Sequence, residues 1–491
     1  MNPHSDYDVI IAGGGMAGLI AAASVAHYSN QRARVLVVDR NPASEPGKKT
    51  HNGWTCGDAV SRNSLNFLAR NLGIQYGRPE VEHDVKGIYV YSPDHKTKVL
   101  FEGEGHLLNR KLAPRRQVTD AQKLGVEFKW GVTAERLLAE DGYVAGVSGR
   151  DSEGDSFRAT AKVVIDATGS SSVLRRFLPI ESYIEREIDM DDIEATGRYI
   201  LEFDRGAEDE TYFTPEYCLI HLDQYIAAAG YAWVFPKGNN KVNIGLGVSK
   251  SGLDRRNRRF NKQDNLQSLI DTYVRENPVI KNPRLASGED DGDNAKGNWQ
   301  VPVRRQNDCM VANGFAVVGD AAWLPRPLDA GGIGPSIYAS VILGKVVAAA
   351  LEANDTGQES LWGYNAEYMK THGFQMASFE VLRRYLQTLT NEQINYGMKH
   401  FLSEEDIQAI TDRKHPDFNR TQFFNPAMWF RVLGDLNLAR GLRYTAKKSQ
   451  TLVTHNLEYP ESPGRFTAWR DHLRAELRET VEKFKPLDAL Q

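Results

Sequence analysis

Cysteine is scarce in this sequence. The 491 residues contain three, Cys56, Cys218 and Cys309, which are far apart and odd in number. A disulfide framework needs pairs, and an iron–sulfur cluster or structural zinc site needs closely spaced ligands such as Cys-x-x-Cys, a pattern that does not occur here. We therefore expect no metal, and a reducing compartment such as the cytosol.

Long apolar runs and an excess of one charge are also missing. Without a stretch of about 18 apolar residues we expect no membrane-spanning helix. The first residues lead directly into a strand-like segment, so we expect no secretory signal. Lys and Arg number 60 against 64 Asp and Glu, a net charge of −4, which gives no case for a nucleic-acid partner. We expect a cytoplasmic protein, and peripheral contact with the inner face of the cell membrane stays open.

The chain begins with a β-α-β pattern. Residues 7–12 and 34–39 are rich in Val and Ile and predict buried strands, and the Ala-rich residues 19–28 predict a helix between them. Strands are also predicted within residues 87–102, 126–155, 163–168, 198–248 and 315–319, a helix runs on to 351, and the rest is mostly helical. Because Rossmann-like elements occur at both ends of the first 350 residues, the domains must interleave.

A dinucleotide fingerprint joins the first strand to the first helix. Gly13-Gly14-Gly15-Met16-Ala17-Gly18 matches G-x-G-x-x-G, and Asp39 ends the second strand about 20 residues later. Gly13 permits the tight turn, Gly15 lets the backbone approach a pyrophosphate, and Gly18 allows close helix–strand packing. The helix N-terminus faces the phosphate charge, and Asp39 can accept hydrogen bonds from a ribose. A glycine-rich turn without a ligand is the alternative.

Two later motifs narrow the cofactor to FAD. Asp166-Ala167-Thr168-Gly169 ends a strand in the middle of the chain, and Gly319-Asp320-Ala321-Ala322 ends another, before the glycine-rich residues 328–334 and a long helix. A carboxylate at a strand end can bind hydroxyls of the ribityl chain, and glycines at a helix N-terminus can approach the pyrophosphate and flavin ring. The ordinary structural alternative for Asp320 is a helix N-cap.

No second G-x-G-x-x-G follows a strand elsewhere, which argues against a built-in NAD(P)H domain. We expect the electrons to come from an external donor, with ferredoxin, NAD(P)H and deazaflavin all open.

The three-part distribution of FAD motifs resembles flavoproteins of the glutathione-reductase type, and among them the p-hydroxybenzoate hydroxylase-like proteins. This resemblance implies an α/β fold in which a Rossmann-like FAD-binding domain is interleaved with an antiparallel β-sheet substrate domain and followed by a helical C-terminal region. It also implies an arginine beside the FAD, at Arg110. The expected segments are 1–75, 106–180 and 301–350 for FAD, 76–105 and 181–300 for substrate, and 351–491 for a helical cap.

A second resemblance is to the geranylgeranyl reductase family. Gly230-Tyr231-Ala232-Trp233-Val234-Phe235-Pro236, followed after residues 237–244 by Gly245-Leu246-Gly247, is similar to its YxWxFP…GxG signature, and Thr55-Cys56-Gly57-Asp58-Ala59 is similar to its Cys-Gly segment near the flavin. Within the family the chain is most similar to the archaeal digeranylgeranylglycerophospholipid reductases, which saturate isoprenoid chains of membrane lipids.

This second resemblance implies an isoprenoid lipid substrate and a set of site residues. The implied FAD contacts are Ala17, Asp39, Cys56, Gly57, Ala59, Arg110, Ala134, Asp320, Gly332 and Ile333. The implied substrate contacts are Tyr231, Trp233, Phe235, Pro236, Gly245 and Gly247.

The chemistry of isolated alkenes fits these residue types. Tyr231, Trp233 and Phe235 alternate along a predicted strand, so they share one face and can form an apolar wall for a prenyl chain; sheet core is the alternative. Reduction needs a hydride from the flavin and a proton for the other carbon. Cys56 is the candidate to assist protonation or to shape the site, unless it is a buried, inert cysteine.

Two departures from the family pattern bear on the substrate. Pro114 interrupts an expected helix after Arg110, and Trp-Leu-Pro-Arg-Pro-Leu-Asp at 323–329 is bulkier than expected. A flavin monooxygenase or halogenase is the nearest rival, because halogenases carry a Gly-Trp-x-Trp-x-Ile-Pro element that residues 230–236 partly match. A non-catalytic flavin electron carrier is the rival from another class.

The C-terminal third has no recognisable signature. Residues 424–430 are densely apolar, and Phe466, Trp469, Leu473, Leu477, Val481 and Phe484 recur at helical spacing. Packing onto the catalytic body is the common reason for such a stripe. A cap over the lipid site or a surface that rests on the bilayer is the functional alternative.

Overall fold

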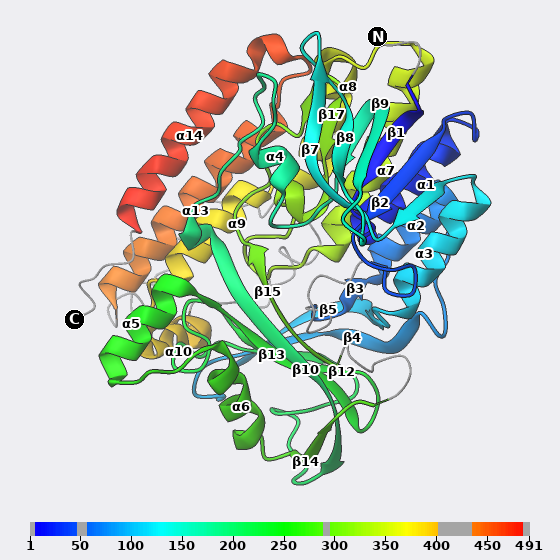
Figure 1. The fold of residues 1–491 in the computed structure, drawn as a ribbon. Helices are drawn as coiled ribbons and strands as arrows, with labels where there is room; N and C mark the ends of the chain where they lie inside the picture. Colours follow the sequence, from blue (N-terminus) through cyan, green and yellow to red (C-terminus); the bar gives the residue numbers. More distant parts are fainter. Residues whose placement is uncertain (1–4, 47–55, 288–294, 401–434, 485–491) are drawn as a thin grey trace.

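Two β-sheets and a group of C-terminal helices form the part of the chain that the structure describes (Figure 1). It is a computed structural model and describes residues 5–46, 56–287, 295–400 and 435–484. The fold is α/β, with a Rossmann-like sheet interleaved with a mostly antiparallel sheet, as the sequence predicts.

The first sheet contains the Rossmann-like elements. Its main path runs β16-β17-β9-β1-β2-β6. The strands from β17 to β6 are parallel to one another, and β16 is antiparallel to β17. The strands are β1 (Tyr7–Ala12), β2 (Val35–Asp39), β6 (Glu127–Trp130), β7 (Thr133–Glu140), β8 (Tyr143–Arg150), β9 (Ser156–Asp166), β16 (Val311–Ala312) and β17 (Phe315–Val317). Strands β7, β8 and β9 form an antiparallel meander.

Helices cover this sheet, and α1 and α7 are the most apolar of them. The helices of this part are α1 (Met16–Tyr28), α2 (Arg62–Leu72), α3 (Leu112–Lys123), α4 (Val173–Arg176), α7 (Ile333–Glu352) and α8 (Gln358–Tyr368), with a 3-10 turn η3 (Gly319–Ala322). Helix α1 packs along α7 and α3 (Figure 1). The hydroxyl of Ser340 donates to the carbonyl oxygen of Ala17 at 2.8 Å, which fixes α7 against the start of α1.

Pro114 does not break α3, contrary to the expectation. The helix begins at Leu112, so Pro114 is its third residue. The first four N–H groups of a helix have no partner within it, and the missing N–H of proline costs nothing there.

The second sheet follows the order β14-β10-β13-β12-β11-β4-β5-β3, with β15 also paired to β10. Its strands are β3 (Ala59–Ser61), β4 (Val81–Tyr91), β5 (Lys98–Leu108), β10 (Ile193–Arg205), β11 (Cys218–His221), β12 (Ala232–Pro236), β13 (Lys241–Ser249), β14 (Ile280–Leu285) and β15 (Lys296–Pro302). Helices α5 (Lys250–Phe260) and α6 (Leu266–Glu276) contact its strands β10 and β13. Ala232, Val234, Ile244 and Leu246 pack with Leu269 and Ile270 of α6, so one face of the sheet is apolar core.

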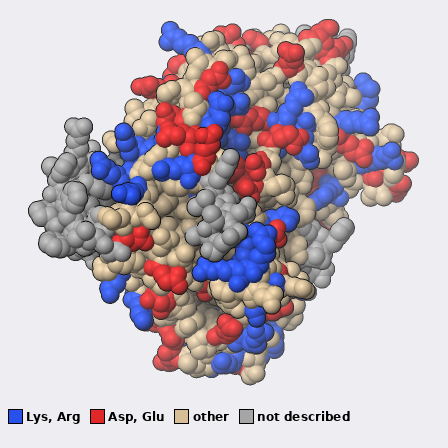
Figure 2. Space-filling view, turned by 90° about the vertical axis from the view of Figure 1, so that its left-hand side faces the viewer, with Lys and Arg blue, Asp and Glu red and all other residues tan. Residues whose placement is uncertain are grey.

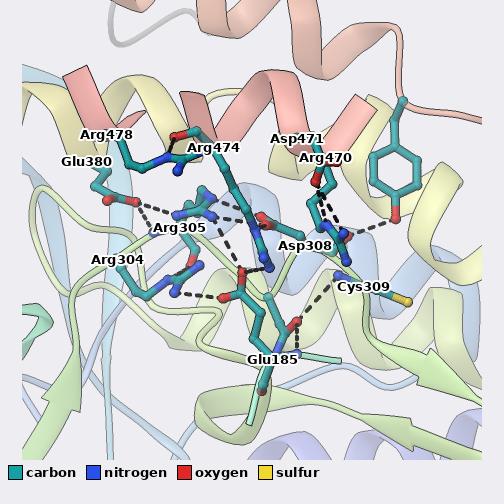
Figure 3. Close-up of polar contacts among 12 residues, drawn as sticks. Glu185, Arg304, Arg305, Asp308, Cys309, Glu380, Arg470, Asp471, Arg474 and Arg478 are labelled. Carbon is teal, nitrogen blue, oxygen red and sulfur yellow. Dashed lines mark hydrogen bonds and ion pairs between the residues drawn. The ribbon is translucent and has the colours of Figure 1, made fainter. Parts of the chain in front are cut away.

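The C-terminal helices are held to the two sheets by a buried cluster of charges, which we call the arginine cluster. These elements are η4 (Met369–Gly373), α9 (Met376–Leu386), α10 (Asn391–His400), α13 (Leu436–Leu457), η6 (Pro463–Arg465) and α14 (Phe466–Lys483). The short turn η1 (Met190–Asp192) directly precedes β10. The arginine cluster comprises Glu185, Arg304, Arg305, Asp308, Glu380 and Arg474 (Figure 3).

Arg305 is the centre of the arginine cluster. Its guanidinium binds Asp308 at 2.9 Å and Glu380 of α9 at 3.3 Å, and the neighbouring Arg304 binds Glu185 at 2.8 Å. Arg474 of α14 reaches both Glu185 and Asp308. Charges this deep are tolerated because each has a partner of opposite sign.

The apolar stripe of α14 packs inward. Phe466, Trp469, Leu473 and Leu477 are buried, and Phe466 contacts the rings of Trp362 and Tyr459. The packing interpretation is therefore confirmed for this stripe. The apolar residues 424–430 lie outside the described residues.

The sequence predicts no membrane-spanning helix, and helix α7 bears on that prediction. Its 20 residues are long and apolar enough to cross a membrane, although most of that surface is buried inside the protein. The face formed by α5, α13 and α14 carries interspersed acidic and basic side chains rather than one sign (Figure 2).

Candidate active site

The three FAD motifs meet at the carboxyl ends of the parallel strands. A Cβ on Gly13, whose φ is +109°, would lie 2.3 Å from the carbonyl oxygen of Ala167, and one on Gly319 would lie 2.8 Å from the Cβ of Ala17. The backbones of the three motifs are therefore too close to admit side chains. Gly15, in contrast, has no atom of the described residues within 4 Å of its Cβ position, so within this part of the chain the N-terminus of α1 is open.

Asp39 stabilises the glycine loop. Its carboxylate accepts hydrogen bonds from the backbone N–H groups of Gly14 (2.5 Å) and Asn41 (2.7 Å). Burial raises the pKa of Asp39, and these hydrogen bonds lower it in part. Trp130 lies against Gly14, and sequence reasoning missed it. Ala134 lies at the start of β7, after Val132, whose N–H donates to the carbonyl oxygen of Asp39.

The two strand-end aspartates have different surroundings. Asp166 is fully buried, and its carboxylate accepts hydrogen bonds from Thr168, Ser172 and Arg175. Asp320 is half-buried in η3, with Oδ1 3.7 Å from the position of a Cβ on Gly332. Val318 precedes η3 and Gly332 precedes α7, so Asp320 is the N-cap of neither helix.

Arg110 lies beside the start of α1. It is buried, and Nη1 is 3.8 Å from the Sδ of Met16, the first residue of α1. Ile333 is the buried first residue of α7, directly after Gly332. The open Gly15, the helix N-terminus and the carboxylates of Asp39 and Asp320 form a site that fits the phosphates and hydroxyls of a dinucleotide such as FAD.

Tyr231, Trp233 and Phe235 share the sheet face opposite α6, as the alternation predicts. Their rings form a row, with centroids 6.1 Å apart between Tyr231 and Trp233 and 6.2 Å between Trp233 and Phe235. Trp233 and Phe235 also pack in an apolar cluster with Leu107 and Ile220, so they contribute to the sheet core as well. Pro236 pairs with Val242, a residue of the α6-side core.

The two glycines of Gly245-Leu246-Gly247 lie on the same face, beneath larger side chains. A Cβ on Gly245 would be 2.6 Å from Cζ2 of Trp233. A Cβ on Gly247 would be 3.0 Å from Oε2 of Glu194. Each glycine therefore provides the room that a neighbouring side chain occupies.

This face meets the cofactor-binding loops. Gly57 lies against Phe235, since a Cβ there would be 2.9 Å from the ring. The hydroxyl of Tyr231 donates to the carbonyl oxygen of Asp329 at 2.5 Å, in the glycine-rich segment before α7. The contacts join the Cys-Gly segment, the aromatic row and the third FAD motif.

A buried polar network holds the Cys56 segment. The side-chain amide of Asn243 donates to the carbonyl oxygen of Cys56 at 2.7 Å and to the carboxylate of Asp58 at 2.8 Å, while its oxygen accepts the indole N–H of Trp233 at 2.9 Å. Lys237 pairs with Asp58 (3.1 Å) and Glu82 (2.7 Å). The N–H of Asp58 donates to Sγ of Cys56, which is half-buried.

The charges of this network are fixed by pairing. Burial alone raises the pKa of Asp58, but Lys237, Arg198 and Arg110 bring it below its usual value. Burial lowers the pKa of Lys237, yet Asp58 and Glu82 raise it above its usual value. Both groups are therefore ionised at neutral pH.

Sequence reasoning missed Asp58, Lys237, Asn243 and Glu194 as site residues. The first three lie inside or beside the quoted motifs, and this proximity could have identified them as candidate site residues. Glu194 had none, because its contact with Gly247 depends on strand pairing between β10 and β13.

Comparison with known proteins places the chain in a family. The sequence model of the geranylgeranyl reductase catalytic domain matches residues 192–283. A digeranylgeranylglycerophospholipid reductase of Sulfolobus acidocaldarius is 33% identical over 468 residues, 94% of this chain and 96% of that protein. The chain belongs to the geranylgeranyl reductase family. A reductase of the same name from Methanothrix thermoacetophila is 29% identical, over 82% of this chain and 93% of that protein.

Solved structures support the same fold. A geranylgeranyl bacteriochlorophyll reductase-like protein of Thermoplasma acidophilum has a TM-score of 0.69 at 24% identity, covering 88% of this chain and 99% of that one. The myxobacterial chondrochloren halogenase, a FAD-dependent halogenase, has a TM-score of 0.62 at 17% identity, covering 84% of this chain and 92% of that one. This geranylgeranyl reductase family member thus has a fold that flavin-dependent enzymes of different chemistry also use.

Proposed function

We propose that this protein is a FAD-dependent reductase that saturates isolated C=C bonds in the geranylgeranyl chains of archaeal membrane lipids. The observation that carries the proposal is the meeting of Cys56-Gly57, the aromatic row and the Asp329 segment at one place. Membership of the geranylgeranyl reductase family and the names of the two archaeal relatives support this substrate class.

The residues would hold FAD along the ends of the parallel strands. Gly13, Gly15, Ala17 and Gly18 would face the pyrophosphate at the N-terminus of α1, and Asp39 the adenosine ribose. Asp320, Gly332 and Ile333 would lie along the ribityl chain. Cys56, Gly57, Ala59, Arg110 and Ala134 complete the proposed contacts. When bound and reduced, FAD supplies a hydride.

The protein's own groups would position the alkene and exclude water. Tyr231, Trp233 and Phe235 offer an apolar, aromatic surface to a prenyl chain, with Gly245, Gly247 and Pro236 on the same two strands. Asn243 joins this surface to the Cys56 segment, so the two sides of the site keep a fixed spacing. Cys56 is proposed to shape the site or to assist protonation.

The remaining partners follow from the same proposal. The substrate is an isoprenoid lipid, and the electrons come from an external donor. A cytoplasmic enzyme with peripheral contact at the membrane would have access to both the lipid substrate and the electron donor. Residues 351–491 would serve as a helical cap beside the substrate segments 76–105 and 181–300.

The decisive experiment uses the full chain with bound FAD, reduced by dithionite without oxygen and mixed with digeranylgeranylglyceryl phosphate. We expect the lipid to gain a mass of about 2 Da for each alkene reduced, as the flavin is reoxidised. Unchanged lipid beside a reoxidised flavin contradicts the proposal. Rapid oxygen consumption that depends on an added aromatic substrate favours a monooxygenase or halogenase instead. Cys56→Ala that keeps the full rate removes Cys56 from the chemistry.

A further inference from the structure

Glu194 lies on the sheet face that meets the proposed cofactor site. It is in β10, and its carboxyl occupies the room left by Gly247 of β13, 3.0 Å from the position of a Cβ there. On the next strand, Tyr231 accepts the N–H of Gly247 at its carbonyl oxygen, at 3.0 Å. The Tyr231 hydroxyl reaches the Asp329 segment, and Tyr231 is close enough to Glu194 for the two groups to interact electrostatically.

The surroundings of Glu194 leave its charge poorly compensated. Within the described residues no Lys or Arg forms an ion pair with it, and the amide of Gln387 is 3.5 Å from Oε1. The charge of Arg383 acts on Glu194, but its guanidinium pairs with Asp192 and donates to Gln387. Burial raises the pKa of Glu194 to about 7, with Arg383 acting in the opposite direction. Much of it therefore carries a proton at neutral pH.

The other acidic groups of this region are poor proton donors. Asp58 is ionised by its pairing with Lys237. Asp329 pairs with Arg326 at 2.9 Å. Burial raises the pKa of Tyr231 well above its usual value, so it holds its proton tightly. A carboxylic acid with a pKa near the working pH is the better donor, and environment alone can make one.

We propose that Glu194 is the acid that protonates the alkene, an inference that rests on the proposed function. The C=C π bond breaks, and two C–H bonds form. Bound, reduced FAD would supply a hydride, which is two electrons and a proton, to one carbon. The other receives the proton of the Glu194 carboxyl, whose O–H bond breaks to leave a carboxylate. Water then reprotonates the carboxylate. In this mechanism Cys56 does not take part in protonation and serves only to shape the site.

The test compares Glu194→Gln with the matched control Glu202→Gln. Glu202 lies on the same strand but is exposed. Each variant is loaded with FAD, reduced with dithionite and mixed with digeranylgeranylglyceryl phosphate in a single turnover. We expect Glu194→Gln to reduce the alkene at least ~100-fold more slowly, the scale of lost general-acid catalysis. The Glu202→Gln and wild-type rates should be equal and should fall as the pH rises through about 7.

A second readout does not depend on turnover. Infrared difference spectra of the lipid-free protein should show the C=O stretch of a protonated carboxyl that titrates near neutral pH and is missing in Glu194→Gln. Unchanged visible spectra of the bound flavin would show that the variant keeps its site.

The outcomes separate the two proposals. If the wild type saturates the lipid and Glu194→Gln does so equally fast, the assignment of Glu194 is wrong and the proposed function stands. A missing infrared band also overturns the assignment. If the wild type leaves the lipid unchanged, both proposals fail.

Discussion

Lys237 and Asp58 form an ion pair whose two side chains are almost out of contact with solvent, at 1% and 0% exposure, and 3.1 Å apart. Replacing Lys237 by Met would remove the cation that pairs with Asp58, while Glu82 would keep its pair with Lys241. We expect Lys237→Met to lower the free energy of unfolding by ~3–5 kcal/mol, because breaking one side of a buried pair strands the other charge. Urea titration measures this change in the free energy of unfolding.

The exposed pair of Lys86 and Glu216 is the matched control for that experiment. Lys86→Met should leave the free energy of unfolding almost unchanged, since water screens a surface pair. Similar losses for the two variants would contradict the structural interpretation.

Gly57 is expected to accept no side chain while Phe235 is present. A Cβ there would be 2.9 Å from the ring, and we expect Gly57→Ala to cost ~1–3 kcal/mol of stability through overpacking. Lipid reduction should slow about tenfold, since small displacements in a site are costly. The double variant with Phe235→Leu should recover part of the stability. Gly77→Ala should be neutral in the same thermal melts, because no described residue lies within 4 Å of its Cβ position.

Asp320 should matter for FAD affinity. A charge-assisted hydrogen bond to a ribityl hydroxyl contributes about 1.5–3 kcal/mol, so Asp320→Ala should weaken FAD binding by roughly 10–150-fold. Titration of the apoprotein followed by flavin fluorescence measures this. Asp254→Ala, at an exposed surface pair, is the control. Equal affinities for both variants would exclude Asp320 from the FAD site.

The arginine cluster predicts acid sensitivity. Burial alone raises the pKa values of Glu185 and Glu380, but the neighbouring arginines bring both well below 4.5. Their contribution to stability is therefore fully present above about pH 5 and is lost as the pH falls below 4.5 toward the folded values. The pKa of Asp308 is raised and offsets this loss in part.

Glu380→Gln removes one of the two groups that cause this loss. Its thermal midpoint should lie below that of the wild type at pH 7, and the difference should shrink on acidification to about pH 3. A difference that stays constant with pH would show that Glu380 contributes through packing alone.

Short-range patterns predicted much of this fold. The period-2 alternation of Tyr231, Trp233 and Phe235 places them on one face, and the helical period of Phe466 to Leu477 gives a buried stripe. What the stripe contacts could not be derived, because Trp362 and Tyr459 come from other parts of the chain. The expected break at Pro114 was wrong because it required knowing where α3 begins, and helix starts are the least certain part of such a prediction.

The polar residues of the site were harder to predict for the same physical reason. Asn243 contacts Cys56, and Lys237 contacts Asp58, across more than 170 residues. Such contacts are set by strand order and register, which no local pattern in this sequence specifies. Gly13 and Gly319 were predictable because each adopts a positive φ that glycine accepts easily.

The contact between Glu194 and Gly247 relates two sequence positions that a motif search treats separately. The nearest atoms to a Cβ at position 247 belong to the side chains of Glu194 and Thr196, not to the backbone. An alanine at 247 should therefore be tolerated wherever position 194 carries a small side chain. Among relatives, the second glycine of the GxG signature should be kept where an acidic residue occupies position 194. Where position 194 carries another residue, the glycine position should vary. That glycine would then serve as a marker, readable from sequence alone, for enzymes that carry a carboxyl at this point of the sheet.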